Sequence, residues 1–293
     1  MRPRLVAEHI ELSLGAEAPP RPLRDAIEQV LVAEYGMMAI QAAERAEGML
    51  EAVARVISSR AEAGAAAGTL PILTLIGTAT DIVCGSCHVL PHDTPAVAVA
   101  KENRIHAESL LSAMKNLTFT QFEKFGAAVL RELGVKNPHI TKHGNDQGID
   151  FYGQFSIGQM ESAPAPFFKL AHDVKFAFAG QAKHYPTRSV GPDVVRELVG
   201  AISLARTKTY SSETIDLFED IAIRPFSPLL ALLFTTGELT SGAVQLSEAA
   251  GIISRSGRQL ALYLADRGVG IDRTGETKVF KTELFHAWLA RVV

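Results

Sequence analysis

Two stretches of sequence decide the fold: HGNDQGIDFYG at residues 143–153 and VKFAFAGQAKH at residues 174–184. In the second stretch, large apolar residues alternate with small or polar ones, which predicts a β-strand. Asp150 opens a shorter extended run in the first stretch. Gln181 and Lys183 lie two positions apart near the end of the second strand, so we expect their side chains to share one face.

Helical patterns on both sides of these strands predict an α/β layer architecture for residues 115–266. The capped helix at 119–133 has Thr120 followed three residues later by Glu123, which predicts a capping box. We expect the other helices at 104–114, 192–207, 241–250 and 257–266, and further strands at 138–142 and 228–235.

The N-terminal part is expected to be mostly helical. Apolar residues recur at three- and four-residue spacing over residues 22–63, and Gly36 is expected to break this pattern into two helices. A small-residue hinge is expected at 61–69. The apolar run PILTLIGTATDIV at 71–83 fits either a pair of strands or a buried helix, since periodicity does not separate the two.

Composition indicates a globular protein without an export signal. The 293 residues are 47% hydrophobic and 21% charged, with a formal net charge of −3. Two cysteines are too few for a disulfide scaffold, and no apolar run reaches the ~20 residues of a membrane helix, so a cytoplasmic location is expected.

The charge is divided unevenly along the chain. Residues 1–110 carry 9 basic and 14 acidic side chains, whereas residues 115–208 carry 12 and 8. The acidic first part is a poor candidate for binding phosphate and the basic second part a good one. We therefore expect residues 1–100 to mediate self-association or to contact a regulatory partner protein.

Four side chains suggest phosphodiester hydrolysis: Asp150, Gln181, Lys183 and Glu123. Such hydrolysis needs a divalent cation to neutralise the scissile phosphate and lower the pKa of the attacking water, and a second positive charge near the developing negative charge. Carboxylates and a lysine can fill these roles. Glu123 is also sufficiently explained as a member of the capping box.

These segments resemble the catalytic domain of Mrr-type restriction endonucleases in the PD-(D/E)XK nuclease superfamily. The resemblance covers residues 110–265. Its blocks are FTQFEKFGAAVLRELGV, TKHGNDQGIDFYG, GQAKHY, VVRELVGAI and LLFTTGELTSGAVQLSEAAGI, in that order.

The resemblance implies a restriction-endonuclease-like mixed sheet flanked by helices, and the helical pattern before it predicts a mostly helical N-terminal domain. The expected units are a mostly helical domain of unknown role at 1–104, the nuclease at 105–268 and a C-terminal extension with a helix at 269–293.

The resemblance also implies a role for each candidate residue. Asp150 is the implied central metal ligand, Gln181 a ligand in place of the usual acid, Lys183 the water-orienting cation, and Glu123 an accessory metal ligand or base. The implied cofactor is Mg²⁺, with Mn²⁺ as a substitute. The expected DNA-contacting residues are Lys142, His184, Tyr185 and Arg188.

The expected function is a Mg²⁺-dependent DNA endonuclease, in restriction or antiviral defence against foreign DNA, acting as a homodimer or with a regulatory partner. Two alternatives stay open. One is a DNA-binding or assembly protein that keeps the nuclease fold without activity. The other is a nuclease for RNA or branched DNA, because a fold alone does not fix the substrate.

The motif CGSCH at 84–88 leaves a separate question open. It matches the c-type haem attachment pattern, which requires export, and no export signal is present. Cys84, Cys87 and either His88 or His92 also suit tetrahedral Zn²⁺. The alternative is two buried thiols near a turn, and we expect no zinc.

Overall fold

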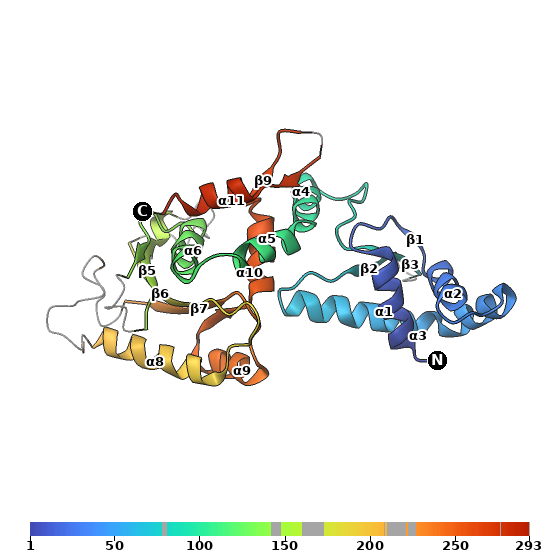
Figure 1. The fold of residues 1–293 in the computed structure, drawn as a ribbon, viewed down its shortest axis with the longest axis horizontal. Coiled ribbons are helices and arrows are strands. Elements are labelled where there is room, and N and C mark those ends of the chain that lie inside the picture. The colour runs from blue at the N-terminus through green and yellow to red at the C-terminus, as the bar shows by residue number, and fades with distance from the viewer. Residues whose placement is uncertain are drawn as a thin grey trace. The chain divides into compact units, whose positions relative to one another are not determined.

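The computed structural model divides the chain into two compact units (Figure 1). The first comprises residues 1–108 and 262–279, and the second comprises residues 109–261 and 280–293. The structure describes residues 1–77, 81–141, 148–159, 173–207, 209, 221, 227–275 and 277–292.

Helices make up most of the first unit, together with a small antiparallel sheet in the order β1-β3-β2. The helices are α1 (Pro3–Leu14), α2 (Leu23–Ala33), α3 (Ala39–Ala66) and α4 (Pro95–Arg104). The strands are β1 (Arg21–Pro22), β2 (Leu73–Ile76) and β3 (Ile82–Gly85). Helices α1, α2 and α3 meet because buried apolar residues recur along one face of each, as Leu23, Ile27 and Leu31 do on α2.

The sequence patterns in this unit are confirmed in part. The break at Gly36 is confirmed, and its φ of +64° explains why a glycine ends this stretch. The apolar run at 71–83 contributes two paired strands rather than a helix. The hinge expected at 61–69 begins later, because α3 continues to Ala66. Helices α1 and α4 were not anticipated.

The C-terminal part of the first unit pairs with α4. Arg104 and Asp266 form a two-pronged ion pair, with Arg104 Nε 2.6 Å from Asp266 Oδ1. Lys278 pairs with Glu102, and the His106 ring lies 3.1 Å from the Lys278 carbonyl oxygen. Two short strands flank Lys278, β9 (Ile271–Asp272) and β10 (Val279–Phe280).

A five-stranded mixed sheet in the order β4-β5-β6-β7-β8 forms the centre of the second unit. Its strands are β4 (His139–Ile140), β5 (Phe151–Ser156), β6 (Lys175–Lys183), β7 (Leu229–Thr235) and β8 (Ile253–Arg255). Neighbouring strands are antiparallel from β4 to β6 and parallel from β6 to β8. The predicted mixed sheet flanked by helices is confirmed.

Helices cover both faces of this sheet (Figure 1). Those that contact its strands are α6 (Phe119–Glu132), α8 (Pro192–Arg206) and α9 (Ser241–Ala250). The remaining helices are α5 (Ala107–Lys115), α10 (Gly257–Asp266) and α11 (Thr282–Leu289), and α11 packs on α6. Gly126 of α6 packs on Phe151, whereas Ala205 of α8 packs in one cluster with Tyr152. Because successive strand residues point to opposite faces, α6 and α8 lie on opposite sides of β5 and β6.

The Phe151 ring is enclosed by two glycines. A Cβ atom on Gly126 would lie 2.3 Å from this ring, and one on Gly180 would lie 2.2 Å from it. Side-chain atoms never approach so closely, so both positions require glycine for this packing. The enclosed ring anchors the start of β5, directly after Asp150.

The predicted capping box is wrong by two residues. Thr118 Oγ1 accepts from Gln121 N at 3.2 Å, and Gln121 Oε1 accepts from Thr118 N at 2.8 Å. The helix begins at Phe119, so Glu123 lies in its second turn. Glu123 is therefore not a member of the capping box, and its presence on the helix needs another explanation.

Among the residues that the structure describes, no helix is both long enough and apolar enough to cross a membrane.

Candidate active site

The register between β5 and β6 brings Asp150 to Gln181. Phe151 pairs with Gly180 in an antiparallel ladder, and continuing that ladder by one residue places Asp150 opposite Gln181. The Asp150 N–H donates to the Gly180 carbonyl oxygen at 2.9 Å, and the Asp150 Oδ2 atom accepts from the Ala182 N–H at 2.7 Å. The side chain is buried, so the carboxylate is held against the end of β6.

Gln181 brings a buried amide oxygen to the same place. Its side chain is 4% exposed, and its Oε1 atom is fully buried with no hydrogen-bond donor in the described part of the chain. Leaving such an atom without a partner costs about 1–3 kcal/mol. Its Nε2 atom lies near Gly148, where an added Cβ atom would be 3.7 Å from it. Within the described residues, the amide oxygen therefore makes no internal hydrogen bond that would compete with a ligand.

Lys183 is the last residue of β6 and is half-buried. It pairs with Thr235 in the parallel ladder to β7, and its carbonyl oxygen accepts from Thr236 N at 3.4 Å. Strand alternation puts its side chain on the face that carries Gln181. Asp150, Gln181 and Lys183 thus lie on one face at the ends of two neighbouring strands.

Glu123 lies on α6 and is half-buried. Its neighbour Phe122 is fully buried and has its ring centroid 5.7 Å from that of His184, the residue after Lys183. The second turn of α6 is therefore close to the end of β6. The role of Glu123 as an accessory ligand or base stays a prediction.

The residues expected to contact DNA have different surroundings. His184 is 9% exposed, and its ring packs edge-on against Phe119 and Phe122. The Arg188 guanidinium lies 3.6 Å above the centre of the Tyr185 ring, and Arg188 is exposed. Lys142 lies outside the described residues. The stacked Tyr185–Arg188 pair presents a planar cation to solvent.

A hard divalent cation fits the donors at this position. Mg²⁺ prefers oxygen ligands, takes few of them from protein and keeps several waters. The Asp150 carboxylate and the orphaned Gln181 Oε1 atom are such oxygens. Within the described ranges, no cluster of three or more His, Cys, Asp or Glu residues has the geometry of a metal site.

The two cysteines of the first unit are free thiols, and both are buried. Burial is the main cause that raises the pKa of each thiol above its ordinary value. Buried thiols with raised pKa values are poor nucleophiles and poor metal ligands in their protonated form. The question of zinc at Cys84 and Cys87 stays open to measurement.

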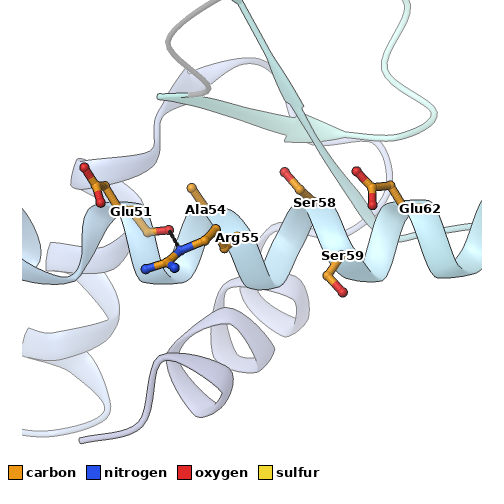
Figure 2. Close-up of a pocket in the computed structure, with 6 residues that line it drawn as sticks. All are labelled: Glu51, Ala54, Arg55, Ser58, Ser59 and Glu62. Atoms are coloured by element: carbon orange, nitrogen blue, oxygen red, sulfur yellow. Dashed lines mark hydrogen bonds between the residues drawn. The ribbon is translucent and has the colours of Figure 1, made fainter.

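A separate hollow runs along α3 (Figure 2). Its lining comes entirely from this helix: Glu51, Ala54, Arg55, Ser58, Ser59 and Glu62. The Arg55 guanidinium donates to the Glu51 carbonyl oxygen at 3.4 Å. The lining thus carries acidic, basic and hydroxyl side chains, and it shares no residue with the candidate site on β5 and β6.

The sequence patterns did not single out Phe119. It is the first residue of α6, it is 66% exposed, and its ring contacts His184. The sequence signal that could have identified it is its position: an aromatic residue at the start of the helix, three residues before Phe122, the first buried residue.

Two solved structures are similar to this chain. One is the MspJI restriction endonuclease in complex with a 27-mer oligonucleotide, with 18% identity and a TM-score of 0.37 over 70% of this chain. The other is the DNA modification-dependent restriction endonuclease AspBHI, with 19% identity and a TM-score of 0.37 over 65% of this chain. The aligned part spans 39% of the length of each of these proteins.

Comparison with curated proteins gave no significant match. Residues 114–222 match the Mrr-type catalytic family, described as restriction endonuclease. This range includes Asp150, Gln181, Lys183 and Glu123. The resemblance stated from the sequence is confirmed: residues 114–222 of this chain match the family of Mrr-type restriction endonuclease catalytic domains.

Proposed function

We propose that this protein is a metal-dependent DNA endonuclease that hydrolyses phosphodiester bonds. One observation carries the proposal: Asp150 is hydrogen-bonded to the backbone of the segment that holds Gln181 and Lys183, inside the range that matches restriction endonucleases. An acid, an amide oxygen and an ammonium group on one face form a donor set suited to a scissile phosphate and a divalent cation.

Each side chain has a distinct task in this proposal. Asp150 and the Gln181 Oε1 atom hold Mg²⁺ or Mn²⁺, with Glu123 as an accessory ligand or base. When bound, such a cation lowers the pKa of a coordinated water and offsets negative charge on the phosphate. The Lys183 ammonium orients the attacking water and stabilises charge that develops on the phosphate oxygens.

The surroundings of the site support DNA as the substrate. Residues 115–208 carry four more basic than acidic side chains, and neutralising phosphates provides much of the affinity of DNA-binding proteins. We propose that Arg188, stacked on Tyr185, contacts the DNA backbone together with Lys142, and that His184 supports this contact. Restriction of foreign DNA is the proposed biological role, on the basis of the family.

The proposal is tested by incubating the full chain with plasmid, single-stranded DNA and RNA, in Mg²⁺ or in EDTA. We expect cleavage of DNA in Mg²⁺, none in EDTA, and none by the Lys183→Ala variant. Cleavage of RNA but not of DNA would show that RNA, rather than DNA, is the substrate. DNA binding without cleavage of any substrate would favour the alternative of an inactive nuclease fold.

A further inference from the structure

Helix α8 packs on β6 and β7 and runs in the direction opposite to β6. Near the start of the helix, Val194 and Leu198 belong to one cluster with Tyr185, which follows the end of β6. Near its end, Ala205 belongs to one cluster with Ala177, which lies in the first half of β6. Moving toward the start of α8 therefore means moving toward the end of β6, where the candidate active site lies.

Ala201 marks the point where α8 passes Gln181. A Cβ atom on Gly148 would lie 3.2 Å from the Ala201 Cβ atom and 3.7 Å from the Gln181 Nε2 atom. Glu197 precedes Ala201 by four residues, so the two side chains lie on the same face of the helix. The edge of α8 that carries Glu197 is therefore the edge beside the candidate site.

The spacing along the two elements places Glu197 level with Lys183. Four helical residues span about 6 Å, and the two strand residues from Gln181 to Lys183 span about 6.6 Å. Because the helix and the strand run in opposite directions, the step from Ala201 back to Glu197 matches the step from Gln181 to Lys183. Helical side chains also lean toward the start of their helix, which directs the Glu197 carboxylate toward the end of β6.

The Glu197 carboxylate is available to a ligand. Glu197 is exposed, and its side chain forms no ion pair or hydrogen bond in the part of the chain that the structure describes. An exposed glutamate is stable in water without a partner, so this observation needs a second one that indicates a ligand.

The Gln181 Oε1 atom provides that second observation. It is fully buried and has no hydrogen-bond donor in the described part of the chain, whereas buried polar atoms normally have a partner. A divalent cation would be such a partner, but Asp150 and the neutral Gln181 together provide a single negative charge. Mg²⁺ is usually held by one or two carboxylates. A second carboxylate level with Lys183 would therefore suit the cation.

We propose that Glu197 is a second carboxylate ligand of the divalent cation, together with Asp150 and the Gln181 Oε1 atom. The inference rests on the proposed function, which supplies the cation, and adds a residue of α8 to the site. Two carboxylates balance the charge of the cation, and Lys183 then stays available to orient water. If Glu197 is instead an ordinary solvated residue, its substitution has no effect on metal binding.

Titration of the full chain with Mn²⁺ tests the proposal without DNA and without cleavage, because free Mn²⁺ gives an electron paramagnetic resonance signal that bound Mn²⁺ loses. Disturbing a metal site weakens metal binding by about 10-fold or more, so we expect at least this loss for Glu197→Gln. Glu197→Asp keeps the charge and should recover part of the affinity. The matched control is Glu248→Gln, which removes one negative charge from an exposed position on α9 and should leave Mn²⁺ affinity unchanged.

Folding and the metal requirement separate a ligand from a structural residue. Since Glu197 is exposed, Glu197→Gln should have the melting temperature of the wild type in EDTA. In cleavage assays this variant should need about 10-fold more Mg²⁺ to reach half of its maximal rate. Slower cleavage at an unchanged Mg²⁺ requirement would overturn the assignment, as would equal Mn²⁺ affinity of Glu197→Gln and Glu248→Gln.

The same measurements distinguish failure of this inference from failure of the proposed function. Cleavage by the wild type, with Mn²⁺ binding that Asp150→Asn weakens and Glu197→Gln does not, would overturn the inference alone. Mn²⁺ binding that depends on both acids, without cleavage of any nucleic acid, would support the ligand set and contradict the proposed enzymatic activity. Absence of both Mn²⁺ binding and cleavage in the folded wild type would overturn both.

Discussion

The Asp150 carboxylate accepts a hydrogen bond of 2.7 Å from the backbone N–H of Ala182, the residue between Gln181 and Lys183. This bond joins the start of β5 to the end of β6, so the acid and the two other candidate residues are positioned by one local contact. Since the donor belongs to the backbone, substitutions of neighbouring side chains leave it in place. The geometry of the site therefore depends on Asp150 itself.

Replacing Asp150 should separate its structural from its chemical contribution. Asp150→Asn keeps an oxygen that can accept from Ala182 but removes the negative charge, so cleavage should fall at least about 100-fold with little loss of stability. Asp150→Ala also leaves the Ala182 N–H without its acceptor, which should cost about 1–3 kcal/mol of unfolding free energy. Cleavage rates and urea unfolding of both variants check this, and equal stability of the two would contradict it.

Replacing Gln181 with leucine should abolish cleavage without destabilising the protein. Gln181→Leu has a similar volume and removes a buried oxygen that has no donor in the described part of the chain, so the melting temperature should stay equal or rise. The variant should also lose any increase in melting temperature that Mg²⁺ gives the wild type, because a ligand of the folded state stabilises it. Thermal unfolding with and without Mg²⁺ measures both effects. Gln181→Glu is the matched control and should keep the response to the metal.

The packing of Phe151 between two glycines should be sensitive to a single methyl group. Gly126→Ala places a Cβ atom 2.3 Å from the Phe151 ring and should destabilise the protein by at least about 1–3 kcal/mol. Adding Phe151→Leu should recover part of this loss, because the smaller side chain leaves room. Unfolding of the single and double variants gives the coupling between the two positions, and additive losses would show that the ring is not the obstacle.

The thiols of Cys84 and Cys87 should be unreactive in the folded protein. Burial raises their pKa above the ordinary value of 9.0, so the unfolded state loses these protons first as the pH rises. Stability of the first unit should therefore decrease above about pH 9, and alkylation at neutral pH should require unfolding. Alkylation rates with and without denaturant check this, with a double Cys→Ala protein as the control.

Elemental analysis of protein purified without added metal tests whether the protein contains zinc. We expect none. One equivalent of zinc that disappears in Cys84→Ser would contradict this expectation and show that the thiols are ligands.

Removing the N-terminal residues should affect the C-terminal part of the first unit. A fragment of residues 105–293 lacks Glu102 and Arg104, which pair with Lys278 and Asp266 in the full chain. We expect this fragment to bind DNA in a salt-sensitive manner, to lose self-association, and to be cleaved by protease within residues 262–279. Light scattering, DNA binding and limited proteolysis check the three parts. A fragment that keeps the oligomeric state of the full chain would place self-association outside residues 1–104.

Strand β6 and the candidate residues on it could be predicted because alternation is a strong local signal. The capping box could not be placed correctly, since Thr118–Gln121 and Thr120–Glu123 have the same spacing. In the structure the helix starts at Phe119 and Thr118 is its N-cap residue, so the first pair forms the box.

Helix α4 was missed for a related reason. Its sequence PAVAVA alternates as a strand would, but Thr94 accepts from Val97 N at 3.4 Å and Pro95 occupies the first helical turn. The ion pair of Arg104 with Asp266 joins positions 162 residues apart, which no local pattern can indicate.

Each of the two units is formed from two separate segments of the chain, which limits how proteolysis can separate them. The polypeptide passes between the two units after residues 108, 261 and 279, so three covalent connections join them. One proteolytic nick leaves the other two connections intact, and the nuclease unit cannot be released by a single cut. Preparing the second unit as a separate protein therefore requires cuts at all three connections.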